Sequence, residues 1–262
     1  MANLIKVTNE NYFDPDVSMQ YMGTSQFKTF MDCEARGLAE VKGDFVREAT
    51  TALLVGSYID AHFEGTLDIF KAHHPELFKR DGSLKAEYVQ AEAIINRIER
   101  DELAMKYLSG EKQVVMTGEI EGVPVKIKID SFHPGKAIVD QKIMKDFEPI
   151  WVPDLGKVNF VRAWGYDIQG AIYREVVRQN TGDLLPFFID GATKQDEPDL
   201  AVIRVPDGLL DSSLEVVKSL IVSYHEIKQG IVPATRCEKC KHCRATKVLN
   251  RVQTLDEFDP EI

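Results

Sequence analysis

The stretch DSFHPGKAIVDQK, residues 130–142, contains a Pro-Gly pair between two segments rich in β-branched and aromatic residues. A Pro-Gly pair is typical of a turn, so we expect two antiparallel strands joined at this pair. With the turn as the pivot, Asp130 lies nearly opposite Asp140, and the two-residue period of a strand places Lys142 on the same face. The sequence therefore predicts two carboxylates and one amine close together on a sheet.

Two carboxylates beside a lysine can hold a hard divalent cation, because Mg²⁺ and Mn²⁺ prefer oxygen ligands. Such a cation stabilises the charge that develops in phosphoryl transfer, and the lysine would position or deprotonate the attacking water. An ordinary Asp–Lys ion pair on a solvated edge is the alternative for Asp140 and Lys142. A metal site is favoured because Asp140 follows the apolar run 137–139, where an unpaired carboxylate would be costly.

The wider region 112–143 is rich in β-branched residues and predicts a three-stranded meander. Apolar and charged residues alternate in its second strand, so Lys126 and Lys128 share a face with Asp130. Apolar periodicity and turn residues predict helices and strands on both sides of the meander. Helices are expected at 24–41, 47–72, 84–108, 164–180 and 207–229, and further strands at 184–190 and 200–205. These elements predict an α/β (α+β) fold with a central mixed sheet flanked by helices, because the central strands follow each other too closely for crossovers.

Length and composition exclude several classes of protein. The chain has 262 residues, of which 44% are hydrophobic, so it can bury a core and is not disordered as a whole. We expect a single domain over residues 1–262. No apolar run approaches the roughly 18 residues of a membrane span, and the first residues are too polar for a signal peptide, so we expect a cytoplasmic protein with no membrane partner.

A basic segment at residues 236–251 interrupts an otherwise acidic chain of net charge −10, and an acidic tail follows at 252–262. The net charge argues against a protein that coats nucleic acid with its whole surface, but a basic segment can still bind DNA locally. A charge run of this kind is more often a solvated stretch near a chain end. The candidate DNA contacts are Lys126, Lys128, Arg236, Lys239, Lys241 and Arg244.

Three motifs occur in an order that resembles a known enzyme family. Asp130 followed by Asp140-Gln141-Lys142 resembles the core of the PD-(D/E)xK nuclease superfamily. The upstream segment 56–62 is similar to the G-x-x-x-x-x-H helix of its RecB-type and RecE-like phage exonuclease branches, and Gln169 to Tyr173 is similar to their Q-x-x-x-Y helix. The resemblance implies a restriction-endonuclease-like core.

The same resemblance implies a role for each residue of the site. His62, Asp130, Asp140 and the backbone carbonyl of Gln141 would bind Mg²⁺ or Mn²⁺, and Lys142 would serve the attacking water. Gln169 and Tyr173 would position the substrate strand. The implied activity is a Mg²⁺-dependent exodeoxyribonuclease for DNA end resection in recombination or repair, with a single-strand annealing protein as partner and a possible homo-oligomeric assembly.

The four cysteines are a second set of candidate metal ligands. Cys237, Cys240 and Cys243 have C-x-x-C-x-x-C spacing, and Cys33 is the other cysteine of the chain. This order resembles the iron–sulfur staple of AddB-like nucleases, which implies a [4Fe–4S] cluster held by all four cysteines. Zn²⁺ with His242 as the fourth ligand is the competing hypothesis, and reduced cysteines without a metal are the third.

A different class of function is also open. The chain could be a nucleic-acid or protein-binding module with a zinc-type cysteine site and structural carboxylates, or an inactive nuclease-like domain that binds DNA ends. Convergence of Asp130, Asp140 and His62 in the folded chain would favour the enzyme over the binding module.

Overall fold

The computed structural model describes residues 4–153 and 155–258, and its centre is a mixed sheet. In the described residues this sheet has six strands: β1 (Met22–Gly23), β2 (Glu111–Ile120), β3 (Val123–His133), β4 (Ala137–Met144), β7 (Phe187–Thr193) and β8 (Leu200–Arg204). The strands β2, β3 and β4 form an antiparallel meander, β4 runs parallel to β7, and β8 is antiparallel to β7. The predicted mixed sheet is confirmed.

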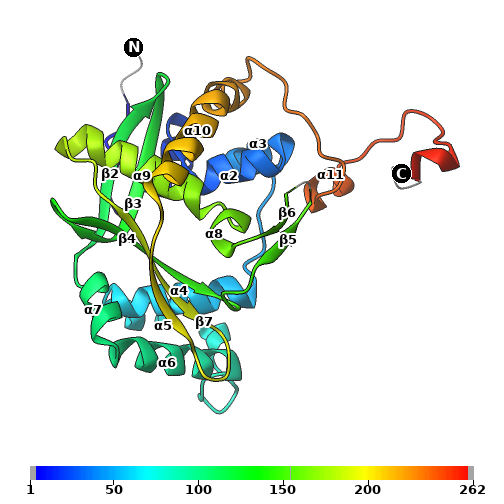
Figure 1. The fold of residues 1–262 in the computed structure, drawn as a ribbon. Coiled ribbons are helices and arrows are strands. Elements are labelled where there is room, and N and C mark those ends of the chain that lie inside the picture. The colour runs from blue at the N-terminus through cyan, green and yellow to red at the C-terminus, as the bar shows by residue number, and fades with distance from the viewer. Residues whose placement is uncertain (1–3, 154, 259–262) are drawn as a thin grey trace.

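Helices cover both faces of the sheet (Figure 1). One layer contains α4 (Thr51–Phe63), α5 (Leu67–His73), α6 (Ala86–Glu99) and α7 (Glu102–Leu108). The other contains α1 (Pro15–Gln20), α2 (Thr24–Asp32), α3 (Glu34–Lys42), α8 (Phe160–Ala163), α9 (Tyr166–Thr181) and α10 (Asp207–Lys228). A small hairpin of β5 (Ile150–Val152) and β6 (Gly156–Val158) and the short helix α11 (Lys241–Ala245) lie outside the sheet. No helix in the described part of the chain is long and apolar enough to cross a membrane.

The first three predicted helices are each broken in two, which corrects the prediction. Cys33 has extended backbone angles (φ −168°) and separates α2 from α3. Gly65, with φ of +75°, lies between α4 and α5 in the left-handed region that glycine adopts without strain. Asp101 starts α7 by accepting hydrogen bonds from the N–H groups of Leu103 and Ala104. Apolar periodicity continues through all three breaks, so it does not reveal them.

Two strands, β1 and β4, pair with different parts of the same edge of β3, and the gap between them marks the position of the candidate site. The opposite edge is paired with β2 from Val123 to Phe132. On the shared edge β1 pairs in parallel with Val125 and Lys126, and β4 pairs with residues 131–133. Among the described residues no strand pairs with this edge at positions 127–130. The two partner strands therefore leave an opening in the sheet that ends at Asp130.

Candidate active site and cysteine centre

Asp130 and Asp140 lie opposite each other at the point where β3 and β4 separate, as the turn predicts. Asp130 Oδ2 accepts a hydrogen bond from the backbone N–H of Gln141 at 2.9 Å. Its Oδ1 accepts a second bond from Gln113 Nε2 at 3.3 Å. The Asp130 carboxylate thus takes the place of a backbone acceptor on the edge of β4 and fixes the two strands at the opening.

Asp140 is 1% exposed and lies in an ion pair with Lys142. Asp140 Oδ1 accepts a hydrogen bond from Gln169 Nε2 at 2.6 Å, whereas Oδ2 faces Lys142 Nζ and accepts no well-directed hydrogen bond from the described residues. Burial and the charge of Asp130 together raise the pKa of Asp140 to about 7, against the opposing charge of Lys142. Removing charge from this buried group would therefore be favourable in the absence of a further cation.

Lys142 is held as a cation at the centre of the site. Burial acts to lower the pKa of Lys142, but the carboxylates of Asp140 and Asp130 outweigh burial and raise that pKa above its ordinary value. Lys142 Nζ also donates to the carbonyl oxygen of Gln141 at 3.2 Å. The lysine therefore contacts two of the groups that are expected to hold a metal.

Gln169 and Tyr173 face the interior of the protein, which corrects their expected role. Gln169 is 8% exposed and binds Asp140, and Tyr173 is 6% exposed and donates from its hydroxyl to the carbonyl of Lys128 at 2.8 Å. Neither side chain is exposed enough to position a DNA strand directly. The Q-x-x-x-Y segment of α9 instead orients Asp140 and occupies the unpaired edge of β3.

His62 contacts a neighbouring helix and not the carboxylate group, and its role as a metal ligand stays a prediction. Its Nε2 lies 2.8 Å from Glu99 Oε1 of α6, so the imidazole faces the neighbouring helix. A different row of α4 faces the sheet, and it carries Asp60 with Glu64 at the end of the helix. Asp130 and Asp140 lie opposite each other on neighbouring strands, but His62 does not join them, so the three groups whose convergence would favour the enzyme are not all brought together.

Asp60 and Glu64 supply the carboxylates that the sequence interpretation missed. Together with Asp130 and Gln141 they line a cavity of about 10 Å³ between α4 and the sheet. That volume is about the size of one bound water or ion. Burial raises the pKa of Asp60 well above its ordinary value, with the charge of Asp130 adding to it, and burial also raises the pKa of Glu64. The i, i+4 spacing of Asp60 and Glu64 on one helix could have indicated this row.

The donor set of the site fits a hard divalent cation. Buried carboxylates with raised pKa values repel one another unless a cation neutralises them. In the described residues, however, no three of these carboxylates have oxygen atoms that all lie within 4.8 Å of one another. The site thus has the ligand chemistry for Mg²⁺ or Mn²⁺, but the carboxylates are not drawn together as tightly as the cysteines described below.

Lys28 of α2 is a further charged group beside the site. Burial and the charge of Lys142 together lower the pKa of Lys28 to about 8, and the charge of Asp140 opposes the shift. The ammonium groups of Lys28 and Lys142 each lie 5.4 Å from the ring centre of Tyr166. Nothing in the sequence indicates this placement, because α2 is more than one hundred residues from β4 in the chain.

Lys126 is not available for DNA, which corrects one expected contact. It is 3% exposed, and its Nζ donates to the carbonyl of Tyr12 and to Ser18 Oγ. Burial lowers the pKa of Lys126 to about 8. Lys128 is half-buried with its Nζ 5.3 Å from the ring centre of Phe13, and its contact with DNA stays a prediction.

Most of the basic segment is engaged in local contacts. Arg236 pairs with Glu238 at 2.7 Å, Lys241 with Glu48 at 3.1 Å, and Arg244 Nη1 donates to the carbonyl of Lys239 at 3.0 Å. These contacts give the segment a structural use, and its role in DNA binding is untested. In the expected acidic tail Glu257 pairs with Arg251 at 2.6 Å, and residues 259–262 lie outside the described residues.

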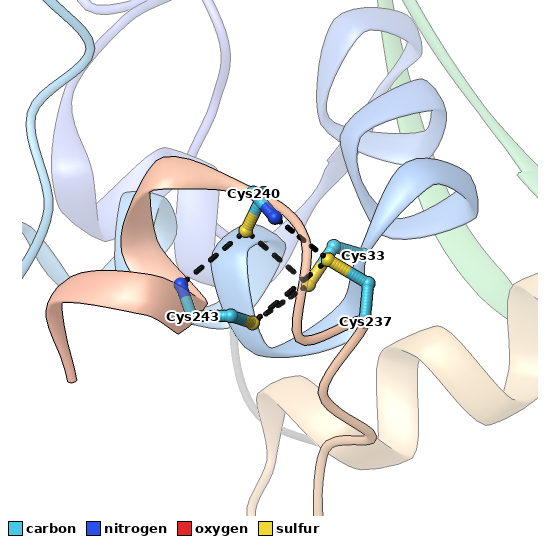
Figure 2. A group of neighbouring side chains, drawn as sticks. All are labelled: Cys33, Cys237, Cys240 and Cys243. Carbon is cyan, nitrogen blue, oxygen red and sulfur yellow. Dashed lines mark hydrogen bonds between the residues drawn. The ribbon is translucent and has the colours of Figure 1, made fainter. Parts of the chain in front are cut away.

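The four cysteines meet in one group (Figure 2). Cys33 comes from the break between α2 and α3, and the other three come from the segment around α11, which packs on α3. All four sulfur atoms lie within 4.8 Å of one another. His242 is not a member of the group: its ring packs against Phe45, with 5.4 Å between ring centres. The fourth member of the group is therefore Cys33, and His242 lies outside it.

A mixed sheet with an Asp–Asp–Lys group at its opening defines a PDDEXK-like nuclease domain, and comparison with known proteins agrees. The family model for a PDDEXK-like domain of unknown function (DUF3799) matches residues 23–246. The chain belongs to this family, and the resemblance seen in the sequence is confirmed.

A solved structure from Eubacterium rectale, described provisionally as an exonuclease, is similar over nearly the whole molecule. It shares 48% identity with this chain, covers 98% of this chain and 100% of its own, and superposes with a TM-score of 0.95. A search of curated proteins gave no match.

Proposed function

We propose that the chain is a metal-dependent exodeoxyribonuclease that hydrolyses phosphodiester bonds at DNA ends. The observation that carries the proposal is the Asp130–Asp140–Lys142 group at the opening between β3 and β4, with Asp140 buried and oriented by Gln169. Membership of a PDDEXK-like family and similarity to a protein described as an exonuclease support it. End resection for recombination or repair, a single-strand annealing partner and an oligomeric assembly are further parts of this proposal.

Asp130, Asp140 and the carbonyl of Gln141 would hold Mg²⁺ or Mn²⁺, and Asp60 or Glu64 would replace His62 as the ligand from α4. The cation supplies Lewis-acid stabilisation of the negative charge that develops on the phosphate. The protein holds these groups in place through the Asp130 bond to the β4 backbone and the Gln169 bond to Asp140. Exposed carboxylates without such support would not be held in a fixed geometry.

Lys142 would position the attacking water by its charge. A general base must give up its proton near the working pH, whereas the neighbouring carboxylates raise the pKa of Lys142. The ammonium group can instead donate to the water or to a phosphate oxygen while it stays next to Asp140. Of the two roles that the sequence leaves open, positioning is the one that this environment supports.

A groove beside the site is the best-placed surface for DNA. It has a volume of about 1180 Å³ and is lined in part by Lys28, Lys42, Arg47, Arg162 and the indole of Trp164. Arg162 and Trp164 are exposed, and Lys28 connects the groove to Asp140 and Lys142. Cationic side chains can contact phosphates and an exposed indole can stack on a base.

Digestion of linear and circular duplex DNA tests the proposed activity. We expect Mg²⁺-dependent loss of the linear substrate, protection of the circle, and no digestion in EDTA. Asp140→Asn should be inactive in the same assay, and a circular dichroism spectrum would show that it is folded. Equal digestion by wild type and Asp140→Asn would contradict the assignment of the site, and intact DNA under every metal condition would favour the binding module or the inactive domain.

A matched pair of charge reversals tests the proposed DNA surface. Arg162→Glu in the groove should raise the KM for linear DNA and weaken the salt dependence of binding, because one phosphate contact is lost. Arg244→Glu in the basic segment should leave both unchanged. The opposite result would return the DNA contact to the basic segment, as the sequence first indicated.

A further inference from the structure

The spacing of the four cysteine sulfur atoms identifies the kind of metal centre that they can form. Cys33 Sγ lies 3.5 Å from Cys243 Sγ and 3.9 Å from Cys240 Sγ, and Cys237 Sγ lies 3.9 Å from Cys243 Sγ. Four thiolates bound to one Zn²⁺ at about 2.3 Å occupy the corners of a tetrahedron whose edges are about 3.8 Å. The observed separations agree with that tetrahedron.

An iron–sulfur cluster requires a wider arrangement. Each thiolate of a [4Fe–4S] cluster binds a different iron atom, so the four sulfurs surround a cube of irons and lie roughly 6 Å apart. Here all four sulfurs lie within 4.8 Å of one another. The cluster implied by resemblance to AddB-like nucleases does not fit between the sulfur atoms at these separations.

We propose that Cys33, Cys237, Cys240 and Cys243 bind a single Zn²⁺ ion in a tetrahedral site of four thiolates. The backbone around the sulfurs is arranged for this purpose. Cys240 N–H lies 3.3 Å from Cys237 Sγ, and Cys243 N–H lies 3.4 Å from Cys240 Sγ. Such N–H donors stabilise thiolates and orient them toward a metal.

The turn between the first two of these cysteines carries a strained residue. Glu238 has φ of +55°, a region that costs a non-glycine residue about 1 kcal/mol or more. The pairing of Glu238 with Arg236 holds this turn, and Arg236 also donates to the carbonyl of Cys243 and to Thr246 Oγ1. The turn presents Cys237 and Cys240 on one side, which is the arrangement that two ligands of a single ion need.

The proposed centre also explains the basic segment. Four thiolates and one Zn²⁺ leave two net negative charges at the site, which neighbouring cations stabilise. Arg236, Lys239, Lys241 and Arg244 lie in the same segment as three of the ligands. These side chains therefore have an electrostatic role that does not involve nucleic acid.

The site fastens the C-terminal segment to the break between α2 and α3. Two further bonds support the same contact: Ala35 N–H donates to the carbonyl of Thr235 at 3.0 Å, and Thr235 N–H donates to Glu34 Oε2 at 2.7 Å. Since Lys28 extends from α2 to the carboxylate site, the zinc site would also restrain that helix. Its role is structural, and it does not depend on the proposed nuclease activity.

Elemental analysis of the full chain, purified without added metal, tests the proposal directly. We expect about one zinc per chain, little iron and no inorganic sulfide. Replacement of the zinc by Co²⁺ should give the intense absorption of a tetrahedral thiolate site. Iron and sulfide in roughly equal amounts, with a brown colour under anaerobic conditions, would overturn zinc in favour of a cluster.

Two variants assign the ligands, and a third separates this site from the nuclease. Cys33→Ser should lose the zinc or bind it far more weakly, and His242→Ala should keep it. Loss of zinc from His242→Ala but not from Cys33→Ser would contradict the four-cysteine site. Asp130→Asn should retain a full zinc content, so the two proposals can fail independently.

Chelation of the wild-type protein keeps the test valid where a cysteine variant fails to fold. A strong zinc chelator should lower the melting temperature, and Zn²⁺, but not Mg²⁺, should restore it. Four freely reacting thiols in anaerobically purified protein, with no effect of the chelator, would overturn the proposal.

Discussion

The carboxylate site and the cysteine centre are brought together by different kinds of structure. Asp130 and Asp140 come from adjacent strands, and the register of one sheet places them. The cysteines come from a break between two helices and from a segment about two hundred residues later in the chain. The candidate oxygen ligands thus lie on one sheet, whereas the candidate sulfur ligands join chain segments that regular structure does not connect. Damage to the first should affect chemistry, and damage to the second should affect stability.

Asp130→Asn should show the largest difference between the two regions, because it should change the rate of DNA hydrolysis without lowering the stability. We expect DNA hydrolysis to fall by roughly two to three orders of magnitude, because a charged group that acts on the reacting centre is lost. The melting temperature should stay the same or rise, since the charge of Asp130 raises the pKa values of Asp60 and Asp140. Initial rates and thermal melts on the same preparation would measure both. A strongly destabilised Asp130→Asn would show that the carboxylate site holds the fold together.

Cys240→Ser should give the converse result. Loss of one thiolate should lower the melting temperature by roughly 5–10 °C, as expected for a few kcal/mol in a chain of this size. Hydrolysis at low temperature should remain within a small factor of wild type, because no cysteine contacts the carboxylates. Melts and rates at 10 °C would separate the effects, and a variant that is stable but inactive would join the two regions into one functional unit.

Substitutions on α4 show which residue of this helix belongs to the carboxylate site. Asp60→Asn should weaken Mg²⁺ binding by about tenfold to a hundredfold, whereas His62→Gln should leave it unchanged. The physical reason is that Asp60 lines the cavity beside Asp130, while His62 faces Glu99. Activity titrated with Mg²⁺ gives the metal requirement of each variant. A shift in His62→Gln but not in Asp60→Asn would restore the histidine as ligand.

The two regions should also differ in the sign of their pH dependence, and this is the smallest expected effect. Asp190 of β7 is paired in register with Gln141 of β4, so it lies beside the carboxylate site; burial and, to a smaller extent, the charge of Asp101 raise its pKa to about 7. The ordinary value is about 3.9, so the folded chain binds this proton more tightly; the resulting stability is complete below about pH 4 and is lost as the pH rises through about 7. Asp190→Asn should remove about 1–2 kcal/mol of the decrease in the free energy of unfolding between these two pH values. This is less than the free energy that corresponds to the whole pKa shift of Asp190, because water can reach a partly opened site.

Zinc-linked stability has the opposite sign, because thiolates must lose protons to bind the metal, and it therefore decreases as the pH falls. Urea unfolding at pH 5 and pH 8, with and without a zinc chelator, measures both contributions. A wild type and an Asp190→Asn variant with parallel pH profiles would show that Asp190 is ionised in the folded protein.

The sheet could be predicted from the sequence because the alternation and turn residues that indicate strands are local in the chain. Alternation around Val125 and Ile127 and the turn before Ala137 define β3 and β4, and the register of β3 and β4 then follows. The helix breaks do not interrupt the apolar pattern; Gly65 and the N-cap residue Asp101 could have indicated two of them, whereas nothing in the sequence indicates the break at Cys33. Cys33 is a residue type with no strong preference for ending a helix, and its extended backbone is explained by its place among the sulfurs.

The orientation of His62 is equally hard to predict from the sequence. Period 3.6 shows which residues share a row of α4, but it does not show which row faces the sheet. The row of Tyr58 faces α6, where the Tyr58 hydroxyl donates to Glu92, so Asp60 is left to face the strands. Lys28 is a harder case, since only the folded chain brings α2 beside β4. Residues that meet across such separations cannot be paired from one sequence.

The unequal pairing of β4 has a consequence for how such sites can vary. β4 is aligned with β7 over seven residue pairs, from Ile138 to Met144, but with β3 over only three. The long ladder therefore fixes the position of Asp140 along the sheet, and the short ladder has only to bring Asp130 of β3 opposite it. Residues added to the turn 134–136 would extend into solvent and leave the two carboxylates where they are. The number of residues between the aspartates can thus grow at this turn without moving the carboxylates, and a search for such sites should hold the parallel strand partner constant and let that gap lengthen.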